Sequence, residues 1–120
     1  TMTQVSLPHP LPSEYARTVA DRFRLLGDPT RLMLMDLLRD GERTVGALAV
    51  ELGCTQANAS KHLTLLADGG LVSRRREGLR CYYAVADDAV FTLCDAVCRS
   101  VLAHLDSRAE VLRGPATPGT

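Results

Sequence analysis

The chain has 120 residues, 46% of them hydrophobic, which suits one domain with a modest core. Its 14 basic residues balance its 14 acidic residues, so overall charge does not indicate a nucleic-acid partner and only local clustering can. No apolar run approaches the roughly 20 residues of a membrane span, and no basic segment followed by a hydrophobic one opens the chain, so we expect a soluble cytoplasmic protein with no membrane partner.

Both ends of the chain are expected to be flexible tails. Residues 1–12 and 113–120 are rich in proline or glycine and poor in apolar residues that could pack. The folded domain is therefore predicted to span residues 13–112.

Two helices are expected at the start of this domain. Ser13 can cap the first, in which apolar residues recur at spacings of three and four up to a stop at Gly27. Asp28 can cap the second, with Pro29 at the first helical position, where its missing N–H costs nothing. This second helix is expected to run to Asp40-Gly41.

The next two segments have the pattern of a helix-turn-helix. Thr44 is expected to cap a short helix over Val45–Leu52, which Gly53 ends. Thr55 is expected to cap another helix, from Gln56 to about Asp68. Two short helices joined by a tight turn with glycine are typical of this motif.

After these helices the apolar spacing changes to that of strands. Residues 72–76 and 79–85 are predicted to form a hairpin that turns at Glu77-Gly78. A last, long helix is expected from a cap at Asp87 or Asp88 to about Leu112. The predicted fold class is mainly α with a small β-hairpin (α+β): a winged helix-turn-helix with about five helices and a two-stranded wing, in the order ααααββα.

The second helix of the pair has a polar outer side. On a wheel of 100° per residue, Ala59, Leu63 and Leu66 face the core, and His62 flanks them, so we expect it to pack or cap. The polar side fits a major groove about 12 Å wide, where it can bond to base edges or phosphates. The residues predicted to contact DNA from this helix are Thr55, Gln56, Ala57, Asn58, Ser60, Lys61 and Thr64.

The predicted wing is basic. Arg74 and Arg76 share one strand face, Arg75 takes the other, and Arg80 returns on the opposite strand. Such a ribbon can follow the sugar-phosphate backbone or enter a minor groove, where it supplies the salt-dependent part of the affinity. A polar helix face or an arginine run alone is usually solvated surface. The two in this order indicate DNA binding, and we predict that all four arginines take part.

The stretch from about residue 20 to residue 84 resembles the ArsR/SmtB family of repressors. The segment LLGDPTRL, residues 25–32, is similar to the family's opening signature. The segments SKHL, ADGGLV and REGLRCYY, which begin at residues 60, 67 and 76, are similar to its recognition-helix and wing motifs. The resemblance implies a homodimeric transcriptional repressor whose first and last helices form the interface. It also implies an inverted-repeat operator in double-stranded DNA, from which an inducer releases the protein.

The four cysteines are expected to be reduced thiols, because nothing indicates export to an oxidising compartment. The family often couples DNA release to a metal or metalloid, but two familiar patterns are missing. A thiolate motif on the third helix would need cysteine between residues 47 and 53. A zinc motif on the last helix would need Asp-x-His, whereas Val90 stands two residues after Asp88.

Cys94 and Cys98 remain as a tentative inducer or redox site. A spacing of four places both sulfurs on one helix face, where they can bind a soft metal ion, bind arsenite with a third thiol, or be oxidised. Alternatively they pack as small hydrophobes in line with Val101 and Leu105. Cys54 and Cys81 are less expected to be ligands. The sequence does not identify the inducer or any cofactor.

Two other classes of function fit the sequence less well. A thiol enzyme would need a base near its cysteine, but His104 follows Cys98 by six residues, on the opposite side of the helix. We therefore predict that the protein is not an enzyme. A winged helix used only for protein contacts would leave the wing arginines without a role. A regulator without metal or redox sensing stays open as the alternative to a thiol-based repressor.

Overall fold

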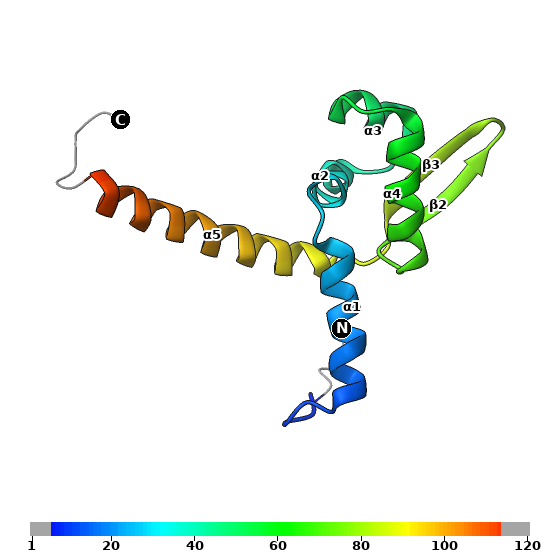
Figure 1. Ribbon diagram of the computed structural model, residues 1–120. Coiled ribbons are helices and arrows are strands. Elements are labelled where there is room, and N and C mark those ends of the chain that lie inside the picture. The colour runs from blue at the N-terminus through cyan, green and yellow to red at the C-terminus, as the bar shows by residue number, and fades with distance from the viewer. Residues whose placement is uncertain (1–5, 114–120) are drawn as a thin grey trace. The chain divides into compact units, whose positions relative to one another are not determined.

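The computed structural model describes residues 6–113 of the chain, and the side chains of residues 6–108. The chain divides after Ala86 into two compact units, which are described separately. In the first unit four α-helices accompany a small antiparallel sheet, and the second unit contains one long helix (Figure 1). The elements of the described residues are α1 (Ser13–Leu26), α2 (Pro29–Leu37), the 3-10 helix η1 (Leu38–Asp40), β1 (Arg43–Thr44), α3 (Val45–Leu52), α4 (Gln56–Asp68), β2 (Val72–Glu77), β3 (Arg80–Val85) and α5 (Ala89–Arg113).

The predicted fold class, mainly α with a small β-hairpin, is confirmed. The sheet, however, has three strands in the order β1-β3-β2 and not two. The added strand β1 pairs its two residues, Arg43 and Thr44, with Tyr83 and Tyr82 of β3. Two residues are too few to show the alternation that marks a strand, so only the pairing across the fold reveals this one.

Three predicted helix caps are confirmed. The side chains of Asp28, Thr44 and Thr55 each accept the backbone N–H three residues further on, at 3.1, 3.1 and 3.0 Å. These bonds satisfy N–H groups that a helix start leaves without partners. Each of the helices α2, α3 and α4 therefore starts at the predicted residue.

Two predicted helix ends are wrong. Pro12, and not Ser13, is the N-cap of α1, and it makes no side-chain bond there. The helix α2 ends at Leu37, and the next three residues tighten into η1. Gly41, with a φ of 128°, then turns the chain toward β1, a conformation that a side chain would strain.

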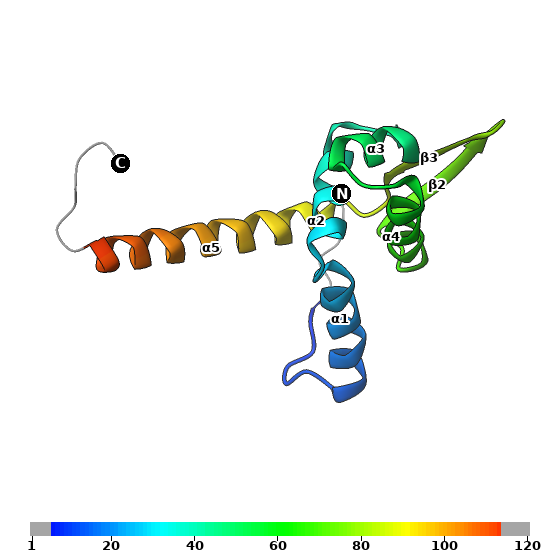
Figure 2. The same ribbon diagram turned by 45° about the horizontal axis from the view of Figure 1, so that its top comes forward.

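The core of the first unit lies between α2, α3, α4 and the sheet. The largest fully buried side chains include Leu34 of α2, Leu48 of α3, Leu63 of α4 and Tyr83 of β3. In both ribbon views the β2–β3 hairpin, which is the wing, extends beyond α4 (Figures 1 and 2). The core therefore holds α4 on one side and leaves its other side and the wing open to solvent.

The second unit consists of α5. The carboxylate of Asp87 accepts the backbone N–H of Ala89 at 3.2 Å, as expected for a cap, and the helix ends one residue after the predicted Leu112. None of the helices over residues 6–113 has the length and apolar character of a membrane span. The limits of the predicted domain and tails stay predictions, because residues 1–5 and 114–120 lie outside the described residues.

Candidate nucleic-acid interface

The predicted contact residues of α4 lie on its solvent side. Thr55, Gln56, Ala57, Asn58, Lys61 and Thr64 are exposed, and Ser60 is half-buried. On the opposite side, Ala59, Leu63 and Leu66 have no exposed surface, as the helical wheel predicts. Because these three side chains hold α4 in the core, its amide, hydroxyl and ammonium groups are presented outward on a rigid element.

His62 connects α4 to the start of α2. Its side chain is 13% exposed, and its Nδ1 lies 3.9 Å from the carboxylate of Asp28. Nη1 of Arg31 lies 3.1 Å from the same nitrogen. The backbone N–H of Arg31 donates to Asp28 and lowers the pKa of that carboxyl below its usual value. His62 thus makes contacts inside the protein, in agreement with the packing role expected from the sequence.

The strand register sorts the wing arginines into two faces. Arg74 is paired with Tyr83, Arg76 with Cys81, and Glu77 with Arg80. Because paired residues share a face and neighbours along a strand alternate, Arg74 and Arg76 lie on one face, as predicted. Arg80 lies on the other face, together with Arg75.

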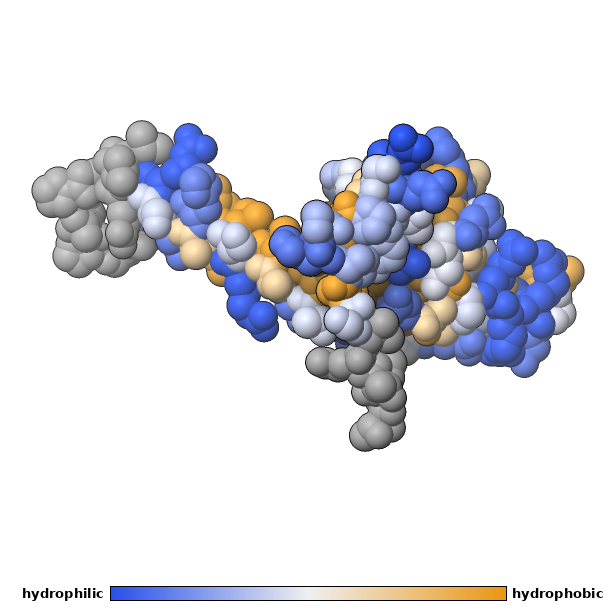
Figure 3. Space-filling model, turned by 90° about the horizontal axis from the view of Figure 1, so that it is seen from below, coloured by the Kyte–Doolittle hydropathy of each residue, from blue (hydrophilic) through white to orange (hydrophobic). Residues whose placement is uncertain are grey.

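The three wing arginines other than Arg75 differ from one another in their contacts within the protein. The buried Tyr83 accepts a hydrogen bond from Arg74 and raises the pKa of that guanidinium. Arg76 and Arg80 are exposed, and no carboxylate among the described residues forms an ion pair with either. Hydrophilic side chains gather over the wing in the space-filling view (Figure 3).

Arg75 makes ion pairs within the protein. Its Nη2 and Nε lie 2.7 and 3.1 Å from the two carboxylate oxygens of Glu42. Its Nη1 lies 3.0 Å from Glu77, and its guanidinium carbon is 4.4 Å from the ring centre of Tyr82. The hydrogen bonds to Glu42 and Glu77 raise the pKa of Arg75, and Arg75 lowers the pKa of Glu42. Among the wing arginines, Arg75 is thus the one that forms ion pairs with carboxylates of the described residues.

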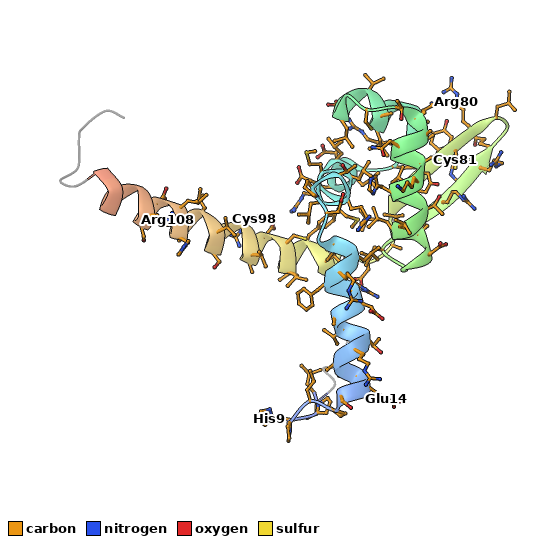
Figure 4. All side chains as sticks on the ribbon, in the orientation of Figure 1. His9, Glu14, Arg80, Cys81, Cys98 and Arg108 are labelled. Atoms are coloured by element: carbon orange, nitrogen blue, oxygen red, sulfur yellow. The ribbon has the colours of Figure 1, made fainter. Side chains whose placement is uncertain are left out.

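A hollow of about 390 Å³ lies where the starts of α3 and α4 meet the wing; it is lined by Thr44, Val45, Gly46, Gln56, Leu79, Arg80 and Cys81. It brings together Gln56 and Arg80, which were predicted from separate motifs; Arg80 and Cys81 are labelled on β3 in Figure 4. The amide nitrogen of Gln56 lies 2.7 Å from the point where a Cβ on Gly46 would stand. Gly46 therefore leaves room for the Gln56 side chain. Sequence reasoning missed Gly46, whose only signal was a glycine inside the first turn of a helix.

The predicted thiol pair lies on α5. Cys98 is exposed and Cys94 is half-buried. Figure 4 labels Cys98 on α5. Cys54 stands in the turn between α3 and α4, and its N–H donates to the carbonyl of Ala49 at 3.0 Å. No disulfide joins the four cysteines, all of which lie in the described range. That range also holds no group of three or more His, Cys, Asp or Glu side chains placed to hold a metal ion.

Known proteins are similar to this chain in sequence and fold. The family model described as a helix-turn-helix domain matches residues 26–75. A probable mercury resistance operon repressor of Streptomyces lividans is 41% identical over 83 residues, which are 69% of this chain and 66%, just under two thirds, of that protein. The nodulation protein NolR of Rhizobium meliloti is 37% identical over 91 residues, covering 73% of this chain and 75% of NolR.

A solved structure agrees with this sequence similarity. It is the solution structure of a homodimeric winged helix-turn-helix DNA-binding domain from Mycobacterium bovis, a possible ArsR-family transcriptional regulator. It superposes with a TM-score of 0.67 and 38% identity, and covers 77% of this chain and 88% of that one.

Proposed function

Because the chain belongs to the ArsR family of winged helix-turn-helix transcriptional regulators, we propose that it is a homodimeric repressor that binds an inverted-repeat operator through α4 and the wing. Members of this family are DNA-binding regulators and not enzymes. The observation that carries the proposal is the two-sided character of α4. Its inner residues, such as Leu63, have no exposed surface, while its outer side is polar and stands beside a basic hairpin.

The two parts of this surface have different roles in the proposal. The outer side of α4, with Gln56, Asn58 and Lys61, enters the major groove and reads base edges. Arg76 and Arg80 lie on opposite faces near the tip of the wing. A hairpin that enters a minor groove edge-on can therefore direct one arginine toward each of the two DNA strands. These contacts supply affinity that depends on salt and not on sequence.

An apolar stripe on α5 supports the dimer. Val97, Val101, Leu102 and Leu105 recur at helical spacing and are each 51–61% exposed. Figure 3 shows hydrophobic residues gathered along this helix. A stripe of this kind is costly in water and is covered when a second copy packs against it. Tyr15 and Phe23 on α1 are also exposed, and contact with a second copy would remove them from water as well. A two-fold dimer would present two copies of α4 to two half-sites, and half-sites related by two-fold symmetry form an inverted repeat.

The operator proposal is tested by fluorescence anisotropy with a labelled duplex from upstream of the protein's own gene. At about 0.15 M salt we expect a preference of at least roughly a thousandfold over shuffled duplex. Replacing both Asn58 and Lys61 by alanine should remove most of this preference, because the variant lacks two of the proposed base contacts. Both side chains are exposed, so the fold should be unaffected. The matched control is Arg99→Ala, which removes an exposed charge from α5. This variant should keep the preference for the operator duplex. Equal affinity for the two duplexes would refute the proposal.

We further propose that a thiol-reactive inducer acts at Cys94 and Cys98. Both lie on the same side of α5 as the apolar stripe, so dimerisation would bring the pairs of two copies together. One pair offers two soft ligands, fewer than a closed metal site uses, and a second pair supplies the rest. Suitable inducers are a soft metal ion, arsenite, or a reactive sulfur species or oxidant. The similarity to a probable mercury resistance operon repressor supports this class of signal.

The sensor proposal predicts that the double variant Cys94→Ser, Cys98→Ser binds the operator normally but is no longer released. An inducer can weaken DNA binding only through its preference for the DNA-incompetent dimer, and the variant lacks the ligands for that preference. Release is measured by titrating the complex with cadmium, mercury, arsenite or a persulfide donor. The control variant, Cys54→Ser with Cys81→Ser, should respond like the wild type. Release of the Cys94/Cys98 variant at the same inducer concentrations would eliminate this site.

If none of these reagents releases the wild type, the alternative is a regulator without metal or redox sensing. The alignment of Cys94 and Cys98 with Val101 and Leu105 favours that alternative, because cysteines covered by a second copy at a dimer interface would pack as small hydrophobes.

A further inference from the structure

The side chain of Arg75 reaches from one edge of the three-stranded sheet to the other. It stands on β2, at one edge, and is paired with Tyr82 of the central strand β3. Tyr82 is in turn paired with Thr44 of β1, at the other edge. The Arg75 side chain passes over the Tyr82 ring and ends on Glu42, which lies just before β1 and 33 residues away in sequence. One side chain thus connects the wing to the segment that leads into α3.

The charge around Arg75 does not suit a DNA phosphate. Its guanidinium forms ion pairs with two carboxylates, Glu42 and Glu77, so its charge is already balanced within the protein. One side of the guanidinium is covered by Tyr82. To bind a phosphate, Arg75 would have to give up its charge-assisted hydrogen bonds to both carboxylates. Arg76 has no such neighbours among the described residues.

We propose that Arg75 is a positioning residue: with Glu42, Glu77 and Tyr82 it holds the wing at the angle at which Arg76 and Arg80 meet the DNA backbone, and it does not contact DNA. This inference rests on the proposed function. It replaces the sequence-based prediction that all four wing arginines are DNA contacts. Because Arg75 and Glu42 are 48% and 38% exposed, their ion pair adds little to global stability, and its effect is on the orientation of the hairpin.

The first test compares Arg75→Gln with Arg76→Gln in operator binding at several salt concentrations. Each lost phosphate contact lowers the slope of log affinity against log salt by about 0.9, or about 1.8 for the two wings of a dimer. We expect that change for Arg76→Gln only. Arg75→Gln should weaken binding roughly three- to tenfold with an unchanged slope, because the contacts persist but are less well aligned. A slope change equal to that of Arg76→Gln would overturn the proposal.

The second test exchanges the charges of the pair. Arg75→Glu and Glu42→Arg should each weaken binding, whereas the double variant restores an ion pair across Tyr82 and should return to within about threefold of the wild type. A true DNA contact would not be rescued, because the carboxylate introduced on β2 would still repel phosphate. Lack of rescue therefore also overturns the proposal.

A third measurement does not require DNA. Hydrogen exchange of the β2 and β3 amides should become faster in Arg75→Gln, while exchange in α4 and the thermal unfolding midpoint stay near the wild-type values. Unchanged exchange in the hairpin would show that Arg75 does not restrain the wing. If the wild type itself has no operator preference, the proposed function fails and this measurement still decides whether Arg75 restrains the wing.

Discussion

Replacing both Arg76 and Arg80 by glutamine is expected to weaken operator binding by several hundredfold at about 0.15 M salt. Each phosphate contact contributes about 0.9 to the salt slope, which is roughly fivefold in affinity at this salt concentration, and a dimer loses four contacts. The slope itself should fall by about 3.6. Both side chains are exposed and form no ion pair among the described residues, so their replacement should leave folding intact.

The control for this prediction removes positive charge elsewhere. Arg17 of α1 and Arg99 of α5 are exposed and lie away from the apolar faces of their helices. The double variant Arg17→Gln, Arg99→Gln should change the slope by less than about 1, because neither arginine belongs to the proposed DNA surface and exposed charges are screened beyond roughly 8 Å at physiological salt. Similar slopes for the two double variants would mean that net charge, and not the wing, attracts DNA.

Replacing Leu63 by alanine is expected to have the largest effect on folding. The Leu63 side chain has no exposed surface, and such a truncation costs about 2–5 kcal/mol because it leaves a cavity in the core. This is a large part of the roughly 5–15 kcal/mol that stabilises a small domain. Operator binding should fall with stability, since α4 is held in place by this contact. The measurement is urea unfolding at one fixed protein concentration, because the stability of a dimer depends on concentration.

Leu65 on the same helix is the matched control. It is 41% exposed, so Leu65→Ala should cost under about 1 kcal/mol. The comparison tests which side of α4 faces the core, and hence which side is free for DNA. If Leu65→Ala destabilised the protein as much as Leu63→Ala, α4 would be rotated and the proposed contact surface would be misplaced.

The sequence predicted those features that depend on neighbours a few residues away. The caps at Asp28, Thr44 and Thr55 need only a short polar side chain and the N–H three residues on. The inner side of α4 follows from the helical repeat, and the shared face of Arg74 and Arg76 from strand alternation. These local rules were sufficient for the fold class and for most of the candidate DNA surface.

The features that the sequence did not predict depend on contacts between distant segments. The pairing of β1 with β3, the room that Gly46 leaves for Gln56, and the ion pair between Arg75 and Glu42 each join residues that no local pattern relates. Strand alternation separates Arg75 from Arg74 and Arg76 already in the sequence, but only the fold brings the carboxylate of Glu42, 33 residues away, to its guanidinium. Short-range periodicity thus established the elements and their polar faces, whereas the roles of individual side chains depend on which charges and rings the folded chain places beside them.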